Sequence, residues 1–179
     1  MKWITPLEPF IKLNMNGSSI GNPRLASVGG LLHNSSSAWI SSFSLNMDIT
    51  SNNIAKLGAV RQGLILVWDL GFKLIHLEIN SMIILSWLTT NNDISPNAIL
   101  LLCDCKNLME RDWTVQVCHI FHKANGSSDA LAKRGNQQHC LLEIYDTCSA
   151  FVYTPFVWDM ENLETNRLCP LRLELFVVV

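Results

Sequence analysis

The feature that most limits the fold is a change of hydrophobic period along the chain. Three segments with the two-residue alternation of β-strands come first, at 10–16, 26–32 and 38–45. A helical pattern follows, from Thr50 or Ser51 to Gly71. Strand patterns then alternate with helical ones: strands at 73–80 and 113–120, helices at 81–88, 96–111 and 125–134. This order predicts the α/β class, with a mixed five-stranded sheet of three antiparallel strands and then parallel strands, covered by helices.

Length and composition predict one packed domain with extensions at both ends. The chain has 179 residues, of which 49% are hydrophobic and 16% charged, so it can bury a substantial core. We assign residues 1–9 to an N-terminal extension, 10–135 to the domain and 136–179 to a C-terminal tail without a predicted role. The net charge of −2 provides no general attraction to nucleic acid, so any such binding requires a local basic patch.

The six cysteines show no disulfide framework spacing, and the N-terminus lacks the apolar core of a secretion signal. We therefore expect reduced thiols in an intracellular protein of the nucleus or cytoplasm, without a membrane-spanning segment. A zinc site is an alternative for five residues: Cys103, Cys105, Cys118, His119 and His122. Residues 103 and 105 lie about 200° apart on a helix, and residues 118 and 119 point to opposite faces of a strand. Core cysteines are the better interpretation.

Several short motifs occur in a specific order. Leu13 to Ser18 reads L-N-M-N-G-S, and G-N-P at 21–23 and V-G-G at 28–30 follow. The others are A-K-L-G-A at 55–59, L-E-I-N-S at 77–81 and H-I-F-H-K-A-N-G-S-S-D-A-L-A at 119–132. Together they resemble the ribonuclease H-like domains of plants, many of them associated with retrotransposon reverse transcriptases. The resemblance covers about residues 10–135 and implies a ribonuclease H-like fold, with Mg²⁺-dependent endonuclease activity on RNA–DNA hybrids.

The same resemblance places the family's four metal-binding acids at positions 16, 56, 80 and 129. Here these positions carry Asn16, Lys56, Asn80 and Asp129, and only Asp129 and the accompanying His119 match the family. Two-metal hydrolysis depends on carboxylates that hold two Mg²⁺ ions about 4 Å apart. Four acids would supply a charge of about −4, whereas these residues sum to about zero, and Mg²⁺ gives up water reluctantly for neutral ligands. We expect a vestigial metal ligand in Asp129 and little or no bound Mg²⁺.

Ordinary structural roles also fit these positions: turn or cap residues for Asn16 and Asn80, a solvated lysine for Lys56, a dipole-matched acid for Asp129. Glu78 could replace a lost carboxylate, but it lies two residues from Asn80, a displacement of about 7 Å along a strand. A cationic cluster for nucleic acid is predicted from Lys12, Arg24, Lys123, Lys133 and Arg134.

The sequence thus predicts a domain that binds nucleic acid, with an RNA–DNA hybrid as partner, impaired or absent nuclease activity and no small-molecule cofactor. One alternative is an active Mg²⁺-dependent ribonuclease. Another is a retroelement-derived remnant or protein-interaction module that keeps only the fold.

Overall fold

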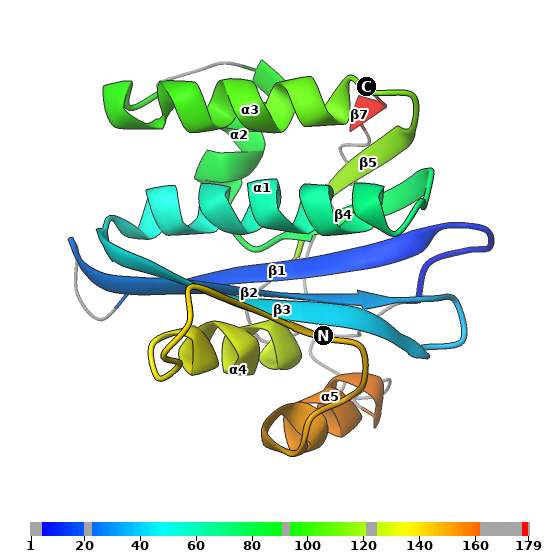
Figure 1. Ribbon diagram of the computed structural model, residues 1–179. Helices are drawn as coiled ribbons and strands as arrows, with labels where there is room; N and C mark the ends of the chain where they lie inside the picture. Colours follow the sequence, from blue (N-terminus) through cyan, green and yellow to red (C-terminus); the bar gives the residue numbers. More distant parts are fainter. Residues whose placement is uncertain (1–4, 20–22, 91–93, 121–124, 162–176, 179) are drawn as a thin grey trace, which may run out of the picture.

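The computed structural model describes residues 5–19, 23–90, 94–120, 125–161 and 177–178. Its centre is a seven-stranded sheet in the order β6-β3-β2-β1-β4-β5-β7 (Figure 1). The strands are β1 (Ile11–Ser19), β2 (Arg24–His33), β3 (Trp39–Thr50), β4 (Leu74–Ile79), β5 (Thr114–His119), β6 (Leu142–Tyr145) and β7 (Val177–Val178). β1, β2 and β3 are antiparallel, β4 is parallel to β1, and β5 is parallel to β4.

The α/β class and the order of the first five strands are confirmed, but the predicted strand count was wrong. β6 pairs antiparallel with β3 and β7 pairs antiparallel with β5, so each adds an edge strand to the predicted five. Both come from the segment after residue 135. Strands of four and two residues are too short to show an alternating period, so no sequence pattern indicated them.

Helices cover both faces of the sheet. One face carries α1 (Asn52–Asp69), α2 (Met82–Thr90), the short 3₁₀ helix η1 (Pro96–Ala98) and α3 (Ile99–Met109); the other carries α4 (Gly126–Gly135) and α5 (Ala150–Glu161) (Figure 1). Ser51 is the N-cap of α1, and its hydroxyl accepts a hydrogen bond from the Ile54 backbone N–H at 3.4 Å. None of the described helices combines the length and apolar character that crossing a membrane requires.

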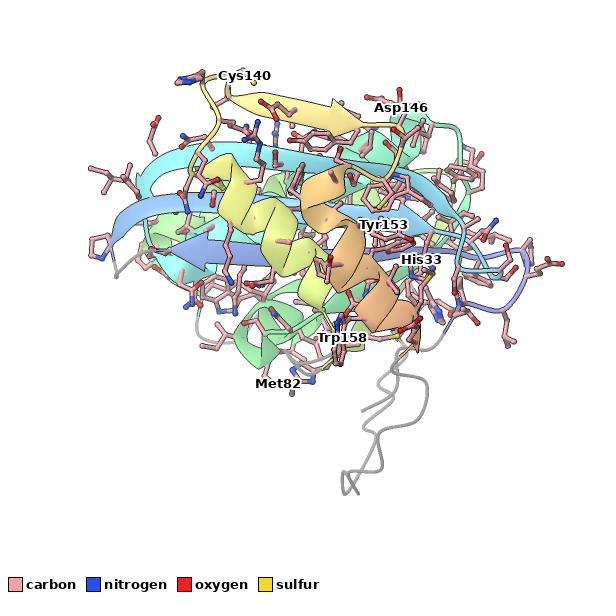
Figure 2. All side chains as sticks on the ribbon, turned by 90° about the horizontal axis from the view of Figure 1, so that it is seen from below. His33, Met82, Cys140, Asp146, Tyr153 and Trp158 are labelled. Carbon is pink, nitrogen blue, oxygen red and sulfur yellow. The ribbon has the colours of Figure 1, made fainter. Side chains whose placement is uncertain are left out.

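The two faces have separate cores. The large core lies between the sheet and α1 to α3, and it includes Leu13 and Leu64. The small core consists of Leu31, Leu131, Val152 and Phe156, which join β2, α4 and α5. Figure 2 shows α4 and α5 side by side across this face, with β6 at the sheet edge. Residues 142–161, part of the tail that had no predicted role, thus pack as part of this fold.

Candidate functional site

Three of the four predicted acid positions meet in one hydrogen-bonded chain. Asn16 lies in β1, Asn80 directly follows the neighbouring β4, and Asp129 lies in the first turn of α4. The Asn80 amide donates to Asn16 Oδ1 at 3.0 Å, and the Asn16 amide donates to Asp129 Oδ1 at 3.1 Å. The parallel pairing of β1 with β4 produces this contact, because it brings equivalent ends of the two strands to the same edge.

The second carboxylate oxygen of Asp129 is also engaged. The Lys133 ammonium, one helical turn further along α4, lies 2.6 Å from Asp129 Oδ2. The Lys133 side chain is largely exposed, whereas that of Asp129 is mostly buried. The only carboxylate at the four predicted positions therefore has an amide donor on one oxygen and an ammonium on the other.

Lys56 packs closely against Gly17, the residue that follows Asn16. A Cβ atom placed on Gly17 would come 2.8 Å from the Lys56 backbone nitrogen and 3.0 Å from its Cγ, so only glycine lets α1 approach β1 this closely. Lys56 is half-buried, and this burial lowers the pKa of its ammonium. His119 ends β5 opposite Ile79; burial lowers its pKa, and the charge of Lys56 lowers it further. The structure thus gathers all five predicted positions.

These residues do not fit a pair of Mg²⁺ ions. The set offers one carboxylate, two neutral amides and two ammonium groups, whereas Mg²⁺ prefers several oxygen ligands of high negative charge. Within the described residues, there is no group of three histidine, cysteine, aspartate or glutamate side chains that could hold a metal ion. The site gathers the positions predicted from the resemblance, and its residues lack the negative charge that a pair of Mg²⁺ ions needs.

Glu78 belongs to a different network, which we call the interior network: Lys12, Asn14, His33 and Glu78. The Lys12 ammonium lies 2.6 Å from Glu78 Oε1, and the Asn14 amide donates to Glu78 Oε2 at 2.6 Å. His33 Nε2 lies 3.1 Å from Asn14 Oδ1. Both carboxylate oxygens of Glu78 are therefore occupied, and it does not replace a lost acid at the site.

The predicted cationic cluster must be corrected at Lys12. This residue is only 2% exposed, and its charge is paired with Glu78. It cannot contact a phosphate in this fold. Lys133 does lie at the site, whereas Lys123 and the Arg24 side chain fall outside what the structure describes.

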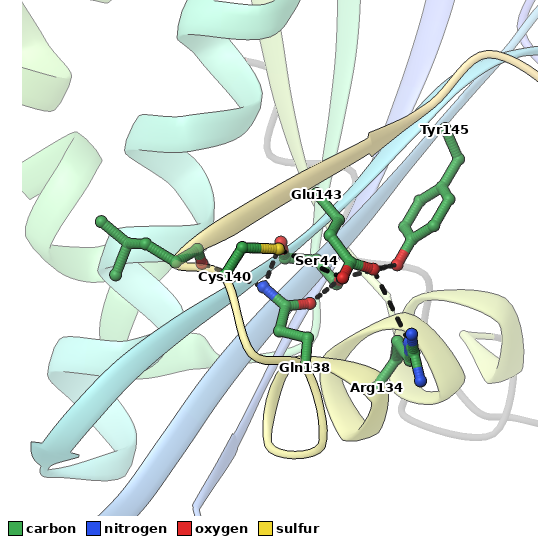
Figure 3. Close-up of polar contacts among 7 residues, drawn as sticks. Ser44, Arg134, Gln138, Cys140, Glu143 and Tyr145 are labelled. Atoms are coloured by element: carbon green, nitrogen blue, oxygen red, sulfur yellow. Dashed lines mark hydrogen bonds and ion pairs between the residues drawn. The ribbon is translucent and has the colours of Figure 1, made fainter.

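Arg134 points to another part of the molecule. Its Nε lies 3.6 Å from Glu143 on β6, and its guanidinium is 5.7 Å from the centre of the Phe151 ring. Figure 3 shows this contact within a network that also includes Tyr145, whose hydroxyl donates to Glu143. Ser44 on β3 donates to Gln138 in the same network. Arg134 thus connects α4 to the edge strand β6.

Sequence reasoning missed the residue that anchors the start of α4. Asp159 on α5 accepts hydrogen bonds from the Gly126 and Ser127 backbone N–H groups at 3.1 and 2.7 Å, and from the Ser127 hydroxyl at 2.6 Å. Burial raises the pKa of Asp159, and these hydrogen bonds oppose that effect. A side chain 32 residues downstream of Ser127 leaves no local capping signal, so no sequence pattern could have identified it.

The cysteines of the alternative zinc site lie in different surroundings. Cys105 is buried, its thiol lies 3.7 Å from the Leu57 carbonyl oxygen, and burial raises its pKa to about 12. Cys103 on the same helix is exposed, so the interpretation as core cysteines holds for Cys105 but is wrong for Cys103. Cys118 is half-buried, and His122 lies outside the described residues.

The sheet order, the helices on its two faces and the position of the site define a ribonuclease H-like domain. The structure is similar to ribonuclease H1 of Halobacterium salinarum, with a TM-score of 0.66 and 25% identity over 72% of this chain and 98% of that one. It also resembles the N-terminal ribonuclease H domain of a Mycobacterium tuberculosis protein, with a TM-score of 0.67 and 18% identity over 72% and 94% of the two chains. LC11-RNase H1, solved in complex with an RNA/DNA hybrid, gives a TM-score of 0.66 at 18% identity over 71% and 96%.

Sequence comparison then assigns the family. Residues 14–135 match the family described as reverse transcriptase-like, and the chain belongs to it. An Arabidopsis thaliana protein named "putative ribonuclease H protein" is 35% identical over 130 residues, which make up 73% of this chain. The matched part is 21% of that relative, so this chain corresponds to about a fifth of its length.

Proposed function

We propose that this ribonuclease H-like domain binds RNA–DNA hybrids without magnesium-dependent hydrolysis of them. The observation that carries the proposal is the state of Asp129, whose two oxygens are held by the Asn16 amide and the Lys133 ammonium. A carboxylate in this position would have to give up both partners to bind a metal. Asn16 and Asn80 would then contribute only neutral oxygens.

Electrostatics support the loss of metal binding. A pair of unit charges 4 Å apart interacts with about 4 kcal/mol at an effective dielectric constant of 20, and a divalent ion facing an ammonium roughly doubles this as repulsion. Lys56 brings such an ammonium to the site in a half-buried position, where solvent screens it incompletely. Rotation of the lysine stem relieves part of the repulsion, but it restores none of the missing negative charge.

Hybrid binding is proposed from the fold and the family together. The fold is that of LC11-RNase H1, whose structure contains an RNA/DNA hybrid, and the family match covers the whole site from Asn16 to Asp129. Exposed Lys133 and half-buried Lys56 support the proposal, because they add positive charge at or beside the positions that the resemblance assigns to the family's chemistry. A domain can keep such a surface after losing its metals, because phosphate contacts depend on cations and not on catalysis.

The test is hydrolysis of an RNA–DNA hybrid in Mg²⁺ or Mn²⁺ by the natural chain and by its Asp129→Asn variant. We expect the two proteins to show the same background rate, because one acid cannot assemble two metal ions. A natural rate clearly above that of the variant would establish an active nuclease and overturn the proposal. Absence of hybrid binding at low salt would remove the nucleic acid from the partners and favour an interaction module.

A further inference from the structure

We propose that the Lys56 ammonium holds a backbone phosphate of the hybrid directly, in the place where the family's enzymes use a divalent ion. This inference rests on the proposed function, since it requires that the domain bind a hybrid. It adds the contact by which binding becomes independent of metal. Three observations carry it. They are the position of Lys56, the fact that no described carboxylate forms an ion pair with it, and the ion pairs that the neighbouring lysines Lys12 and Lys133 already form.

The position of Lys56 is fixed by close packing. The Lys56 backbone and Cγ would collide with any Cβ on Gly17, the residue next to Asn16. The positive charge of Lys56 also lowers the pKa of His119, which lies at the end of β5. The lysine backbone is thus held against β1 next to Asn16, and its charge lies near enough to His119 to affect that residue.

Lys56 is the cation at this site for which the described part of the chain supplies no ion-pair partner. Among the described residues, its ammonium forms no ion pair, whereas Lys133 is paired with Asp129 and Lys12 with Glu78. Two ammonium groups, Lys56 and Lys133, therefore face one carboxylate, which leaves a local charge of about +1. Family acids at positions 16, 56 and 80 would have left this place strongly negative.

An uncompensated ammonium in a half-buried position favours an anion that can reach it. A lysine is a compact point charge with three donors, and it binds phosphate oxygens without requiring a fixed geometry. Partial burial strengthens the attraction, because the effective dielectric constant falls. The same burial lowers the pKa of Lys56, and a bound phosphate would favour the charged form again. The neutral amides of Asn16 and Asn80 do not repel a phosphate, as acids without their metals would.

The experiment measures equilibrium binding of the full chain to a short RNA–DNA hybrid over a range of salt concentrations, with EDTA or with Mg²⁺. The variants are Lys56→Gln, Lys56→Arg and the control Arg61→Gln. Arg61 lies on the same helix but is ion-paired with Asp104 on α3 at 3.0 Å, so its loss also removes one positive charge from α1. Circular dichroism and thermal unfolding establish that each variant is folded.

We expect the natural chain to bind equally well in EDTA and in Mg²⁺. Lys56→Gln should weaken binding about tenfold or more, as expected for a charged hydrogen bond, and should reduce the salt slope by about 0.7 to 0.9. Lys56→Arg should keep most of the slope because it keeps the charge, and Arg61→Gln should leave both quantities unchanged.

Each other result is decisive. If Lys56→Gln binds like Arg61→Gln while the natural chain still binds the hybrid, Lys56 makes no phosphate contact and only this inference fails. If Mg²⁺ strengthens binding by the natural chain, a metal and not the lysine holds the phosphate. If the natural chain does not bind the hybrid even at low salt, this inference and hybrid binding in the proposed function fail together.

Discussion

Two polar regions lie along the same pair of strands and differ in how their charges are balanced. The interior network takes Lys12 and Asn14 from β1 and Glu78 from β4, while the site takes Asn16 from β1 and Asn80 from just after β4. In the interior network every charge has a buried opposite partner. At the site, two amides and a lysine occupy the positions where the resemblance predicts acids.

The difference indicates where the loss of a charged side chain costs much stability and where it costs little. Removing one charge from a buried ion pair leaves the other uncompensated in a low dielectric, which costs several kcal/mol of stability. Lys56, Asn80 and Asp129 are only partly buried, so water can solvate an unbalanced charge there. The residues that differ from the predicted acids lie on the central strand β1, just after the central strand β4 and near the start of α1, whereas the buried pair of Lys12 and Glu78 keeps its opposite charges.

The largest effect should follow from breaking the interior network. Glu78→Gln leaves the Lys12 ammonium buried without its counter-charge, and we expect the free energy of unfolding to fall by about 3–5 kcal/mol. Glu143→Gln is the matched control, because it removes a more exposed ion pair with Arg134, and its loss of stability should be much smaller. Urea unfolding measures both. Equal losses in the two variants would contradict the distinction between interior and surface pairs.

His33 should make the interior network sensitive to acid. Burial, opposed by a hydrogen bond to the Asn34 carbonyl and helped by the charge of Lys12, lowers the pKa of His33 from 6.5 to about 3. Between these values the unfolded chain binds a proton that the folded chain does not, so stability falls as the pH decreases through 6.5. From pH 7 to pH 5 this single group should cost about 2 kcal/mol.

The measurement is urea unfolding at both pH values for the natural chain and for His33→Gln. The variant keeps a polar side chain near Asn14 but has no proton to take up, so its stability should change less by about the same 2 kcal/mol. An identical pH dependence in the two proteins would show that His33 already titrates normally in the folded state.

The smallest effect concerns the site, and it is the most specific. Restoring Asn16→Asp, Lys56→Glu and Asn80→Asp together should create a Mg²⁺ site where the natural chain has none, because Asn16, Asn80 and Asp129 already lie in hydrogen-bond contact. Magnesium at ten times its dissociation constant should then raise the free energy of unfolding by about 1.4 kcal/mol. Calorimetry with Mg²⁺ and thermal unfolding measure the two quantities.

Single reversions are the controls, and each should recover almost nothing, because ligands of one ion act as a unit. Lys56→Glu should matter most in combination, since it changes the local charge by two. Adding Asp129→Asn to the triple variant should abolish the Mg²⁺ response. A folded triple variant that binds Mg²⁺ no better than the natural chain would mean that these positions do not correspond to the family's acids.

The sequence by itself determined the class of the fold, the order of strands β1 to β5 and the positions that form the site. Alternation and helical spacing are local properties, so they can be read from a few neighbouring residues. The motif glycines also had local signals, and the structure gives Gly17 a physical reason: it lets α1 at Lys56 pack closely against β1.

Only the tertiary structure decided which charged side chains are buried in ion pairs. Lys12 and Lys56 are both lysines in regular elements, yet one is buried against Glu78 and the other lies half-buried without an ion pair among the described residues. The hydrogen bonds that Asp159 accepts from the start of α4 also had no signal in the sequence. These outcomes depend on contacts between residues far apart in the chain, and burial then sets the strength of each charge through the local dielectric.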